Sequence, residues 1–147
     1  MEKMTGDEFR WLYASRHRDF SEIDLIGVMV TGSVSEQDFF VQIDLRDVDF
    51  SGSDLSGADL SGANFTDANF SGANLRRCSM SKCNLTRANF SGADLEQAAM
   101  NECIMEYTNF TGADLKLAEV SDFGVSPNLI DAQNLNSVTN FSTIEDN

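Results

Sequence analysis

The residues best suited to metal binding or nucleophilic catalysis, cysteine and histidine, are scarce in this chain. The three cysteines, Cys78, Cys83 and Cys103, form no CxxC pair, and His17 is the only histidine. A structural zinc site needs about four such ligands, and a nucleophile needs a base held beside it. No Ser-His-Asp set, HExxH motif or phosphate-binding loop accompanies them. The sequence therefore predicts no catalytic, cofactor or metal site, and no enzyme.

The elements that place these residues follow a five-residue period. Leu, Phe or Met recurs at every fifth position from Phe40 to Leu115, with Val120 closing the run, and a small residue, usually Ala, stands two positions earlier. Neither the helical period of 3.6 nor the strand period of 2 produces this pattern. A period of five predicts a chain that turns a corner at every step, with one large and one small residue facing inward.

A 20-residue repeat shows how many steps close one coil. The segment Asp49–Leu55 recurs in nearly the same letters at Asn69–Leu75, Asn89–Leu95 and Asn109–Leu115. Four steps per coil would place the phenylalanines of these segments in one ladder and their leucines in another, whereas three steps would stack mixed residues. Like residues pack well at the ~4.8 Å spacing of paired strands, so we predict four steps.

The same frame predicts the extent of the solenoid. Val30–Ser35 aligns with Phe50–Leu55 without an insertion, which leaves Ser33 and Ser35 at inward positions of a degraded first coil. Counting from Phe20 to Val120 predicts just over five coils, a rod roughly 25 Å long.

These residues resemble the pentapeptide-repeat family, with its pattern A-[DN]-[LF]-[ST]-G in the purest form at Ala58–Gly62 and Ala68–Gly72. The resemblance implies an all-β solenoid, a right-handed, four-sided parallel β-helix with a dry core. The segment before Arg18–Ser21 also resembles the start of many cyanobacterial members.

A capping helix is predicted over residues 1–17. Thr5 is the expected N-cap, and Glu8 completes a capping box. Phe9, Leu12 and Tyr13 line one face of this helix. We expect that face to cover outward apolar residues of the first coil, namely Ile26, Met29, Val34, Phe39 and Val41.

The β-helix is expected over residues 18–122, and a C-terminal cap and tail over 123–147. Ser126 and Pro127 have the types of an N-cap and a first helical residue. A short helix beginning there would cover the last coil with Leu129, Ile130 and Leu135.

The 20-residue period also places side chains beside one another. Cys83 and Cys103 would stack on adjacent coils, near enough for a disulfide, but their parallel side chains in slots that usually hold Ala favour small buried hydrophobes. Four basic residues on one coil could suggest a nucleic-acid patch. Acidic residues one coil away favour internal pairing instead, in the sets Asp67 with Arg87, Glu102 with Lys82, and Arg76 with Glu96 and Lys116.

The net charge of −14 and pI of about 4.1 repel nucleic acids and anionic membranes. No apolar run approaches the ~18 residues of a membrane span. We therefore expect neither direct nucleic-acid binding nor association with a membrane. A start without signal-peptide features and an odd number of cysteines indicate a cytoplasmic protein.

Two sets of outward residues form the candidate partner surface. The first is an acidic rail, Asp54, Asp94 and Asp114, in line with Asn74. The second interrupts the polar surface near the far end with Ile104, Tyr107 and Leu117, which are either covered by the tail or form a self-association patch. The sequence thus allows a homodimer that forms through a cap or through this patch.

The function predicted from these features is a non-enzymatic protein-binding or scaffolding module whose protein partner the sequence does not identify. The alternative, implied by the family resemblance, is a DNA-mimicking inhibitor of DNA gyrase. The rail favours that alternative, and the basic residues of one coil oppose it.

Overall fold

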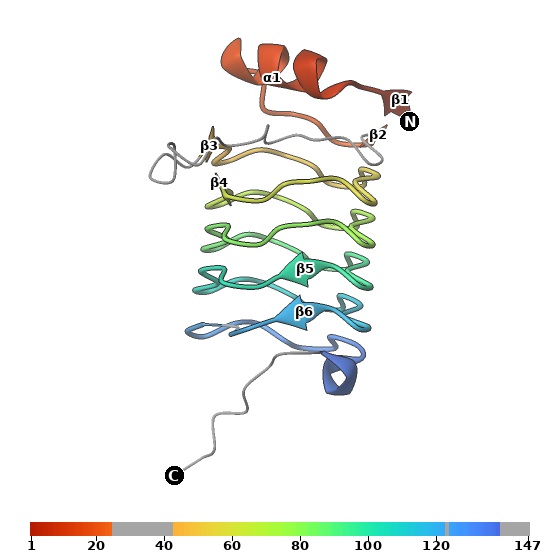
Figure 1. Ribbon diagram of the computed structural model, residues 1–147, viewed down its shortest axis with the longest axis vertical. Helices are drawn as coiled ribbons and strands as arrows, with labels where there is room; N and C mark the ends of the chain where they lie inside the picture. The colour runs from red at the N-terminus through yellow and green to blue at the C-terminus, as the bar shows by residue number, and fades with distance from the viewer. Residues whose placement is uncertain (25–42, 123, 139–147) are drawn as a thin grey trace.

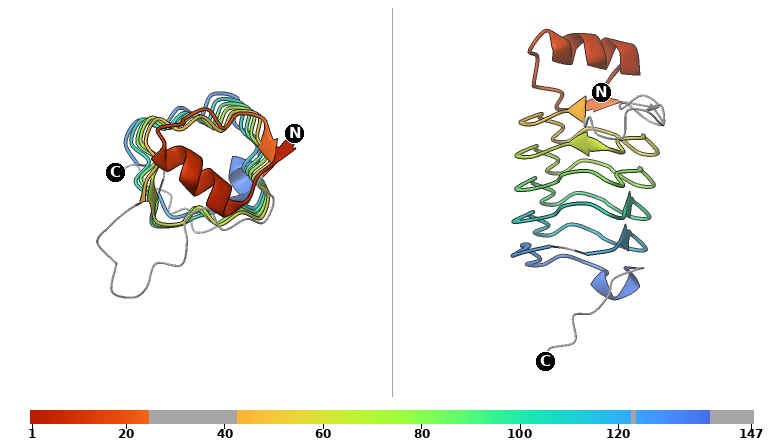
Figure 2. Two further views of the ribbon diagram at one scale, coloured as in Figure 1. Left: turned by 90° about the horizontal axis from the view of Figure 1, so that it is seen from above. Right: turned by 60° about the vertical axis from the view of Figure 1, so that its left-hand side comes forward.

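The computed structural model describes residues 1–24, 43–122 and 124–138. Over these residues the chain winds into a solenoid of stacked coils, with α1 across its N-terminal end (Figure 1). Seen from above, the coils share one four-sided outline (Figure 2). The elements are α1 (Gly6–Ala14), β1 (Glu2–Lys3), β2 (Ile23–Asp24), β3 (Ile43–Asp44), β4 (Ala63–Asn64), β5 (Ala99–Met100), β6 (Glu119–Val120) and the 3-10 helix η1 (Leu135–Ser137).

Over residues 43–120, parallel pairing at a constant offset joins each coil to the next. β3 pairs with β4, placing Ile43 opposite Ala63, and β5 pairs with β6, placing Ala99 opposite Glu119. Single parallel bridges repeat the same offset on every side, as between Asn69 and Asn89. This offset equals the longer repeat of the sequence, so the prediction of four five-residue steps per coil is confirmed.

The backbone turns at each corner through one residue with positive φ. Glycine adopts this conformation at no steric cost, which explains why glycines recur at the corners. Other residue types occupy the remaining corners. In chain order the corners are A (Asp47, Asp67, Arg87, Tyr107), B (Gly52, Gly72, Gly92, Gly112), C (Gly57, Arg77, Gln97, Leu117) and D (Gly62, Lys82, Glu102).

The core is a set of stacked columns of the recurring large residues. Phe50, Phe70, Phe90 and Phe110 are fully buried. Their rings lie nearly parallel, and the centroids of Phe70 and Phe90 are 4.8 Å apart. Such aromatic stacking adds to the free energy gained by burying apolar area. The inward and outward positions agree with the pattern predicted from the sequence.

The Asp or Asn that precedes each large residue has a structural role that the sequence analysis missed. Its Oδ1 accepts a hydrogen bond from the backbone N–H two residues later, as from Ser51 to Asp49 at 2.9 Å and from Ser71 to Asn69 at 3.1 Å. This is an Asx-turn. It stabilises the approach to each corner and explains why Asp and Asn interchange freely at these positions.

The first coil corrects the alignment proposed from the sequence. Asp19 bridges Asp49, and the backbone N–H of Phe20 donates to Asp49 at 2.7 Å, so Phe20 lies over Phe50. The stretch of chain between these partners is longer than one coil by two five-residue steps. The expectation that Val30 takes this place in an uninterrupted frame is wrong. Val30, Ser33 and Ser35 lie outside the described residues.

Helix α1 closes the N-terminal end of the core. Thr5 is its N-cap, and both hydrogen bonds of the capping box with Glu8 are present, as predicted. Phe9 is buried, with its ring centroid 4.5 Å from that of Phe20 and 5.4 Å from that of Phe50. The helix therefore packs on the end of the phenylalanine column. The outward residues that we expected it to cover, Ile26 to Val41, lie outside the described residues.

The C-terminal end corrects a second expectation. Asn128 bridges Asn109 and Gln133 bridges Asp114, so the stacking continues past residue 122 in a coil that is shorter by one residue. Ser126 has φ of +50°, and no helix begins at Pro127 in the described residues, so Ser126 is not the N-cap that we expected. Gly124 fits this shortened coil because a Cβ there would lie 3.1 Å from the carbonyl carbon of Met105.

The apolar residues that we expected to cover the last coil differ in their burial. Leu129 packs against the core, whereas the side chain of Ile130 is 64% exposed. Leu135 begins the 3-10 helix. Among the described residues, no helix has the length and apolar character needed to cross a membrane.

Candidate partner-binding surface

The predicted acidic rail exists as a column on the side of the solenoid between corners B and C. Parallel bridges join its members from one coil to the next. We call it the acidic column, and it consists of Asp24, Asp54, Asn74, Asp94 and Asp114. Each of these side chains is partly exposed. The three rail residues named from the sequence thus lie together. Asp24 also belongs to this column, which the sequence analysis missed because it assumed an uninterrupted frame.

The carboxylates of this column are only partly used by the fold. Asp54 accepts a hydrogen bond from the N–H of Ser56 at 3.0 Å, and Asp94 accepts one from Glu96 at 3.1 Å. Asp114 accepts hydrogen bonds from the N–H of Lys116 and from the amide of Asn134. Asn74 makes the same Asx-turn with Arg76. Since one amide oxygen satisfies this turn, the negative charge at the Asp positions is not required by the backbone.

A second group of acids lies on the other side of corner B. Asp19 and Asp49 bridge each other on the side between corners A and B. Glu22 and Asp131, both at positive φ, extend corner B at its two ends. Between them the corner carries no side chains, because it consists of stacked glycines. In the described residues, the acidic column from Asp24 to Asp114, corner B and the column of Asp19 and Asp49 contain no Lys or Arg, although Lys3 of β1 pairs with Asp24 at the N-terminal end of the acidic column.

Among residues 43–122, the basic residues lie at or beside the other three corners, and several of them pair with acids of neighbouring coils. Arg87 contacts Asp67 through Nε–Oδ1 at 2.7 Å and Nη2–Oδ2 at 2.8 Å, and this guanidinium lowers the pKa of Asp67. Arg76 and Lys116 both bind Glu96, at 2.5 and 3.4 Å. The predicted internal pairing is confirmed for these two sets.

One of these arginines also contacts the acidic column. Nη1 of Arg76 lies 3.2 Å from Oδ2 of Asp94. Arg76 and Arg77 line a shallow hollow of about 390 Å³ with Ser56, Gly57 and Asn74. Arg77 itself donates from Nε to Gln97 at 2.9 Å. Positive charge therefore approaches the acidic column from corner C and not from corner B.

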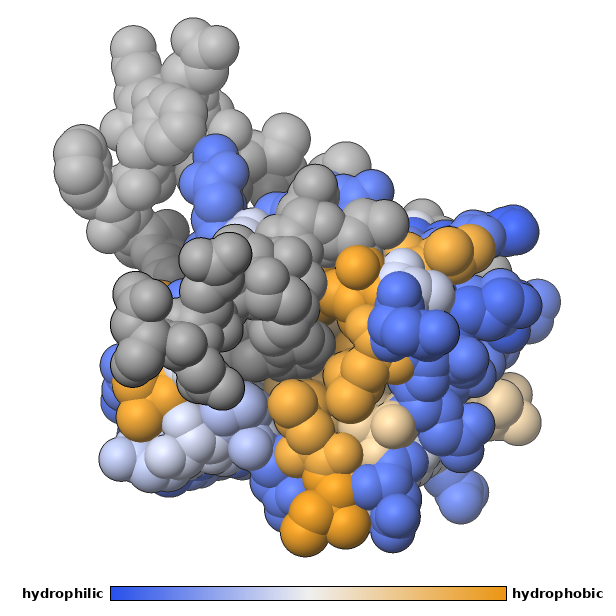
Figure 3. Space-filling model, turned by 90° about the horizontal axis from the view of Figure 1, so that it is seen from below, coloured by the Kyte–Doolittle hydropathy of each residue, from blue (hydrophilic) through white to orange (hydrophobic). Residues whose placement is uncertain are grey.

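The structure divides the predicted apolar patch. Ile104, Tyr107 and Leu117 are all exposed. Ile104 and Tyr107 are close together, but Leu117 is at corner C, diagonally opposite corner A, which holds Tyr107. Val125 lies beside Tyr107 instead, since its carbonyl accepts the Tyr107 N–H at 2.8 Å. Figure 3 shows apolar side chains gathered on this C-terminal end. The three predicted residues are thus not one surface, and none of them belongs to the acidic column.

The thiols are free and face inward. Cys78 and Cys83 are buried, and Cys103 is partly exposed. Sγ of Cys83 donates to the carbonyl of Leu60 at 3.1 Å, and Sγ of Cys103 donates to that of Met80 at 2.9 Å. Burial raises the pKa of Cys78. The hydroxyl of buried Thr108 makes the same kind of hydrogen bond, to Leu85 at 2.9 Å.

In the described part of the chain, no three His, Cys, Asp or Glu side chains are grouped as a metal site.

Comparison with solved structures finds the same architecture. A pentapeptide repeat protein from Nostoc PCC 7120 is 27% identical with a TM-score of 0.52, and the match covers 86% of this chain and 87% of that chain. Another, from the cyanobacterium Cyanothece 51142, is 20% identical with a TM-score of 0.53 over 86% and 88% of the two chains. The latter likeness shows the fold alone.

A pentapeptide repeat protein from the thylakoid lumen of Arabidopsis thaliana is 25% identical with a TM-score of 0.50, and the match covers 69% of this chain. This chain spans 61% of the length of that protein. Comparison with curated proteins gives no significant match.

The pattern of the family described as pentapeptide repeats matches residues 43–81 and 83–121 in 8 copies. These are the residues whose large and small side chains form the stacked columns. The chain belongs to the pentapeptide-repeat family.

Proposed function

We propose that this chain is a non-enzymatic protein-binding or scaffolding module that docks a basic surface of its partner on the two acidic groups around corner B. The observation that carries the proposal is the choice of Asp over Asn in the acidic column. Asn74 shows that the Asx-turn forms without charge, so the carboxylates at Asp54, Asp94 and Asp114 serve something other than the turn. Fixed charge of one sign on a surface steers partners of the opposite sign.

The proposal includes a rigid support. Members of this family are generally repeat proteins without enzymatic activity, and stacked repeats present extended binding surfaces. We infer right-handed coiling and just over five coils, a rod of roughly 25 Å. The division into a cap over residues 1–17, a β-helix over 18–122 and an end region over 123–147 belongs to this inference. A cytoplasmic location is proposed because the three thiols are free.

The neutralising variant Asp54→Asn/Asp94→Asn/Asp114→Asn tests the proposal, because Asn keeps each Asx-turn. A matched control removes three charges outside the two acidic groups, on the side from corner D to corner A, in Glu102→Gln/Glu106→Gln/Asp122→Asn. Each immobilised protein is used to capture cellular proteins from a native extract of its host. We expect a defined protein to bind the wild type and the control and to be lost from the neutralised variant. Equal capture by all three would contradict the proposal.

A second candidate, DNA mimicry directed at DNA gyrase, is favoured by the absence of Lys and Arg, in the described residues, from corner B and from the acidic column between Asp24 and Asp114. The charge density makes DNA mimicry the weaker of the two candidates. The acidic column has roughly one carboxylate per 6 Å at the strand spacing, against about one phosphate per 3.4 Å on each DNA strand. A gyrase supercoiling assay across a salt series tests it. Inhibition that weakens with salt and with the neutralising variant would support mimicry, and no inhibition at micromolar protein would reject it.

Self-association is a further part of the proposal, limited to the side that holds Ile104, Tyr107 and Val125. Exposed apolar side chains that lie together mark interaction sites. Light scattering over a concentration series checks this, with Tyr107→Ser as the test and Leu117→Ser as the control on the opposite corner. We expect only Tyr107→Ser to shift the protein toward monomer.

A further inference from the structure

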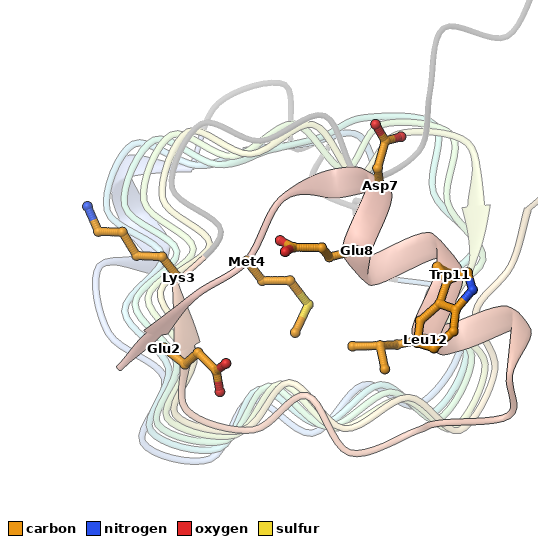
Figure 4. Close-up of a pocket in the computed structure, with 7 residues that line it drawn as sticks. All are labelled: Glu2, Lys3, Met4, Asp7, Glu8, Trp11 and Leu12. Atoms are coloured by element: carbon orange, nitrogen blue, oxygen red, sulfur yellow. The ribbon is translucent and has the colours of Figure 1, made fainter.

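A hollow of about 410 Å³ opens at the N-terminal end, between β1 and α1 (Figure 4). Its size falls within the roughly 300–1,000 Å³ of sites that bind small groups. The hollow is far from Asp94 and Asp114 of the acidic column and at the opposite end from Tyr107, although Lys3 in its wall pairs with Asp24 at the end of that column. It is therefore distinct from the carboxylates of Asp54, Asp94 and Asp114, on which the proposed docking surface depends.

The floor of the hollow is apolar. Met4 and Leu12 are partly buried and pack against the core, and their side chains turn toward the space between β1 and α1 (Figure 4). Trp11 stands beside Leu12 and is 68% exposed. Helix α1 closes the core with Phe9, so the cap does not need the indole of Trp11. An exposed aromatic face next to a hollow is available to a ligand.

The charge at the hollow is negative. The carboxylates of Glu2 and Glu8 turn toward the space, whereas the ammonium group of Lys3 points away from it (Figure 4). Oε2 of Glu8 accepts hydrogen bonds from the N–H of Thr5 at 2.7 Å and from its hydroxyl at 2.8 Å. Its other oxygen, Oε1, is not used by the capping box. Asp7 lies at the outer edge, paired with Arg10 at 2.5 Å.

An apolar floor, an exposed indole and two carboxylates are complementary to one kind of side chain. The methylene stem of arginine lies well on apolar groups, its guanidinium stacks on an aromatic face, and its N–H groups pair with carboxylates. We propose that the hollow binds an arginine side chain from a basic segment of a protein partner. The inference rests on the proposed protein-binding function but uses a different surface.

The single tryptophan of the chain makes a direct test possible. The full chain is titrated with the peptide acetyl-Gly-Leu-Arg-Arg-Leu-Gly-amide, and Trp11 fluorescence is followed at low and high salt. We expect a saturable change that weakens with salt, and no change with the same peptide carrying Glu in place of both Arg. The variant Glu2→Gln/Glu8→Gln should raise the dissociation constant about fivefold. Gln at position 8 keeps the capping box, and circular dichroism verifies the fold.

The control Glu102→Gln/Glu106→Gln removes the same charge at the other end and should bind the peptide like the wild type. Equal dissociation constants in the two double variants would overturn the inference. A Trp11 signal that changes with protein concentration alone would also overturn it, because the occupant would then be a second copy of the chain.

The neutralised column variant separates this inference from the proposed function. Full peptide affinity in Asp54→Asn/Asp94→Asn/Asp114→Asn, with loss in Glu2→Gln/Glu8→Gln, supports the hollow. The reverse result would place the basic segment on the acidic column. It would overturn the inference that the hollow binds arginine and would leave the proposed function unaffected. If the wild type does not bind the peptide but still captures a partner through the acidic column, only the inference about the hollow is overturned.

Discussion

The ring of Phe20 lies over that of Phe50, with centroids 5.9 Å apart, although one and a half coil lengths of chain separate them. Every other phenylalanine step of the column spans a single coil length. Two further contacts show the same excess of half a coil, the bridge between Asp24 and Asp54 and the hydrogen bond from the hydroxyl of Ser53 to the carbonyl of Phe20 at 2.7 Å. The additional residues therefore fall between Asp24 and Ile43.

This relationship predicts which N-terminal residue supports the core. Phe20→Ala should lower the free energy of unfolding by about 3 kcal/mol, because it removes a buried ring from between Phe9 and Phe50. Urea unfolding measures the loss. If the frame were uninterrupted, Val30→Ala would be the costly substitution instead. A larger loss of unfolding free energy in Val30→Ala than in Phe20→Ala would therefore contradict the placement of Phe20 over Phe50.

The middle of the column predicts a larger contrast. Phe70→Ala should cost about 3–5 kcal/mol of unfolding free energy, since Phe50, Phe65 and Phe90 all pack on this ring. Asn69→Ala, at the neighbouring outward position, should cost about 1 kcal/mol for its Asx-turn and side-chain ladder. Equilibrium unfolding in urea compares the two. Losses of equal size would contradict the assignment of inward and outward positions.

Thiol accessibility predicts the order of cysteine modification. Cys103 is partly exposed, whereas Cys78 is buried, and this burial raises the pKa of its thiol. Cys83 is buried as well. Native protein treated with Ellman's reagent should therefore react first at Cys103, and mass spectrometry of the peptides identifies the site.

Two alanine variants provide the control, because Ala fills the same slot elsewhere in the repeat. Cys103→Ala should abolish the fast reaction, and Cys78→Ala should leave it unchanged. Fast labelling of Cys78 in the folded protein would show that the coil opens at that point.

The ion pair of Asp44 with Arg46 predicts an acid-dependent loss of stability. Arg46 donates two hydrogen bonds to the carboxylate, at 2.9 and 2.8 Å, and lowers the pKa of Asp44 from 3.8 to about 2. A folded-state pKa below the unfolded one means that the contribution is present above about pH 4 and is lost as the pH falls to 2. Arg46→Gln should therefore lose less stability between pH 4 and pH 2 than the wild type.

The size of this effect is small, because both side chains are more than half exposed. The midpoint of urea unfolding at the two pH values measures it. Arg77→Gln is the control, since Arg77 donates to Gln97 and not to a carboxylate. The same pH dependence in Arg46→Gln as in the wild type would contradict the prediction.

The sequence by itself determined the repeat, the number of steps per coil and the inward positions. These are local properties, because each five-residue step must bury one large and one small residue and pair with its copy one coil away. The charge pairs of Arg87 with Asp67 and of Glu96 with its two partners follow from the same offset. The capping box of α1 was also visible, as it depends on two residues three positions apart.

Only the tertiary structure decided where the period breaks. The insertion in the first coil is two whole steps, so the five-residue pattern gives no sign of it, and only the pairing of Asp19 with Asp49 shows it. The loss of one residue before Asn128 was mistaken for the start of a helix at Ser126. The grouping of surface residues depends on the corners as well. Ile104 and Leu117 are near in sequence but face different sides, because a chain that turns at every five-residue step carries neighbours apart within one coil.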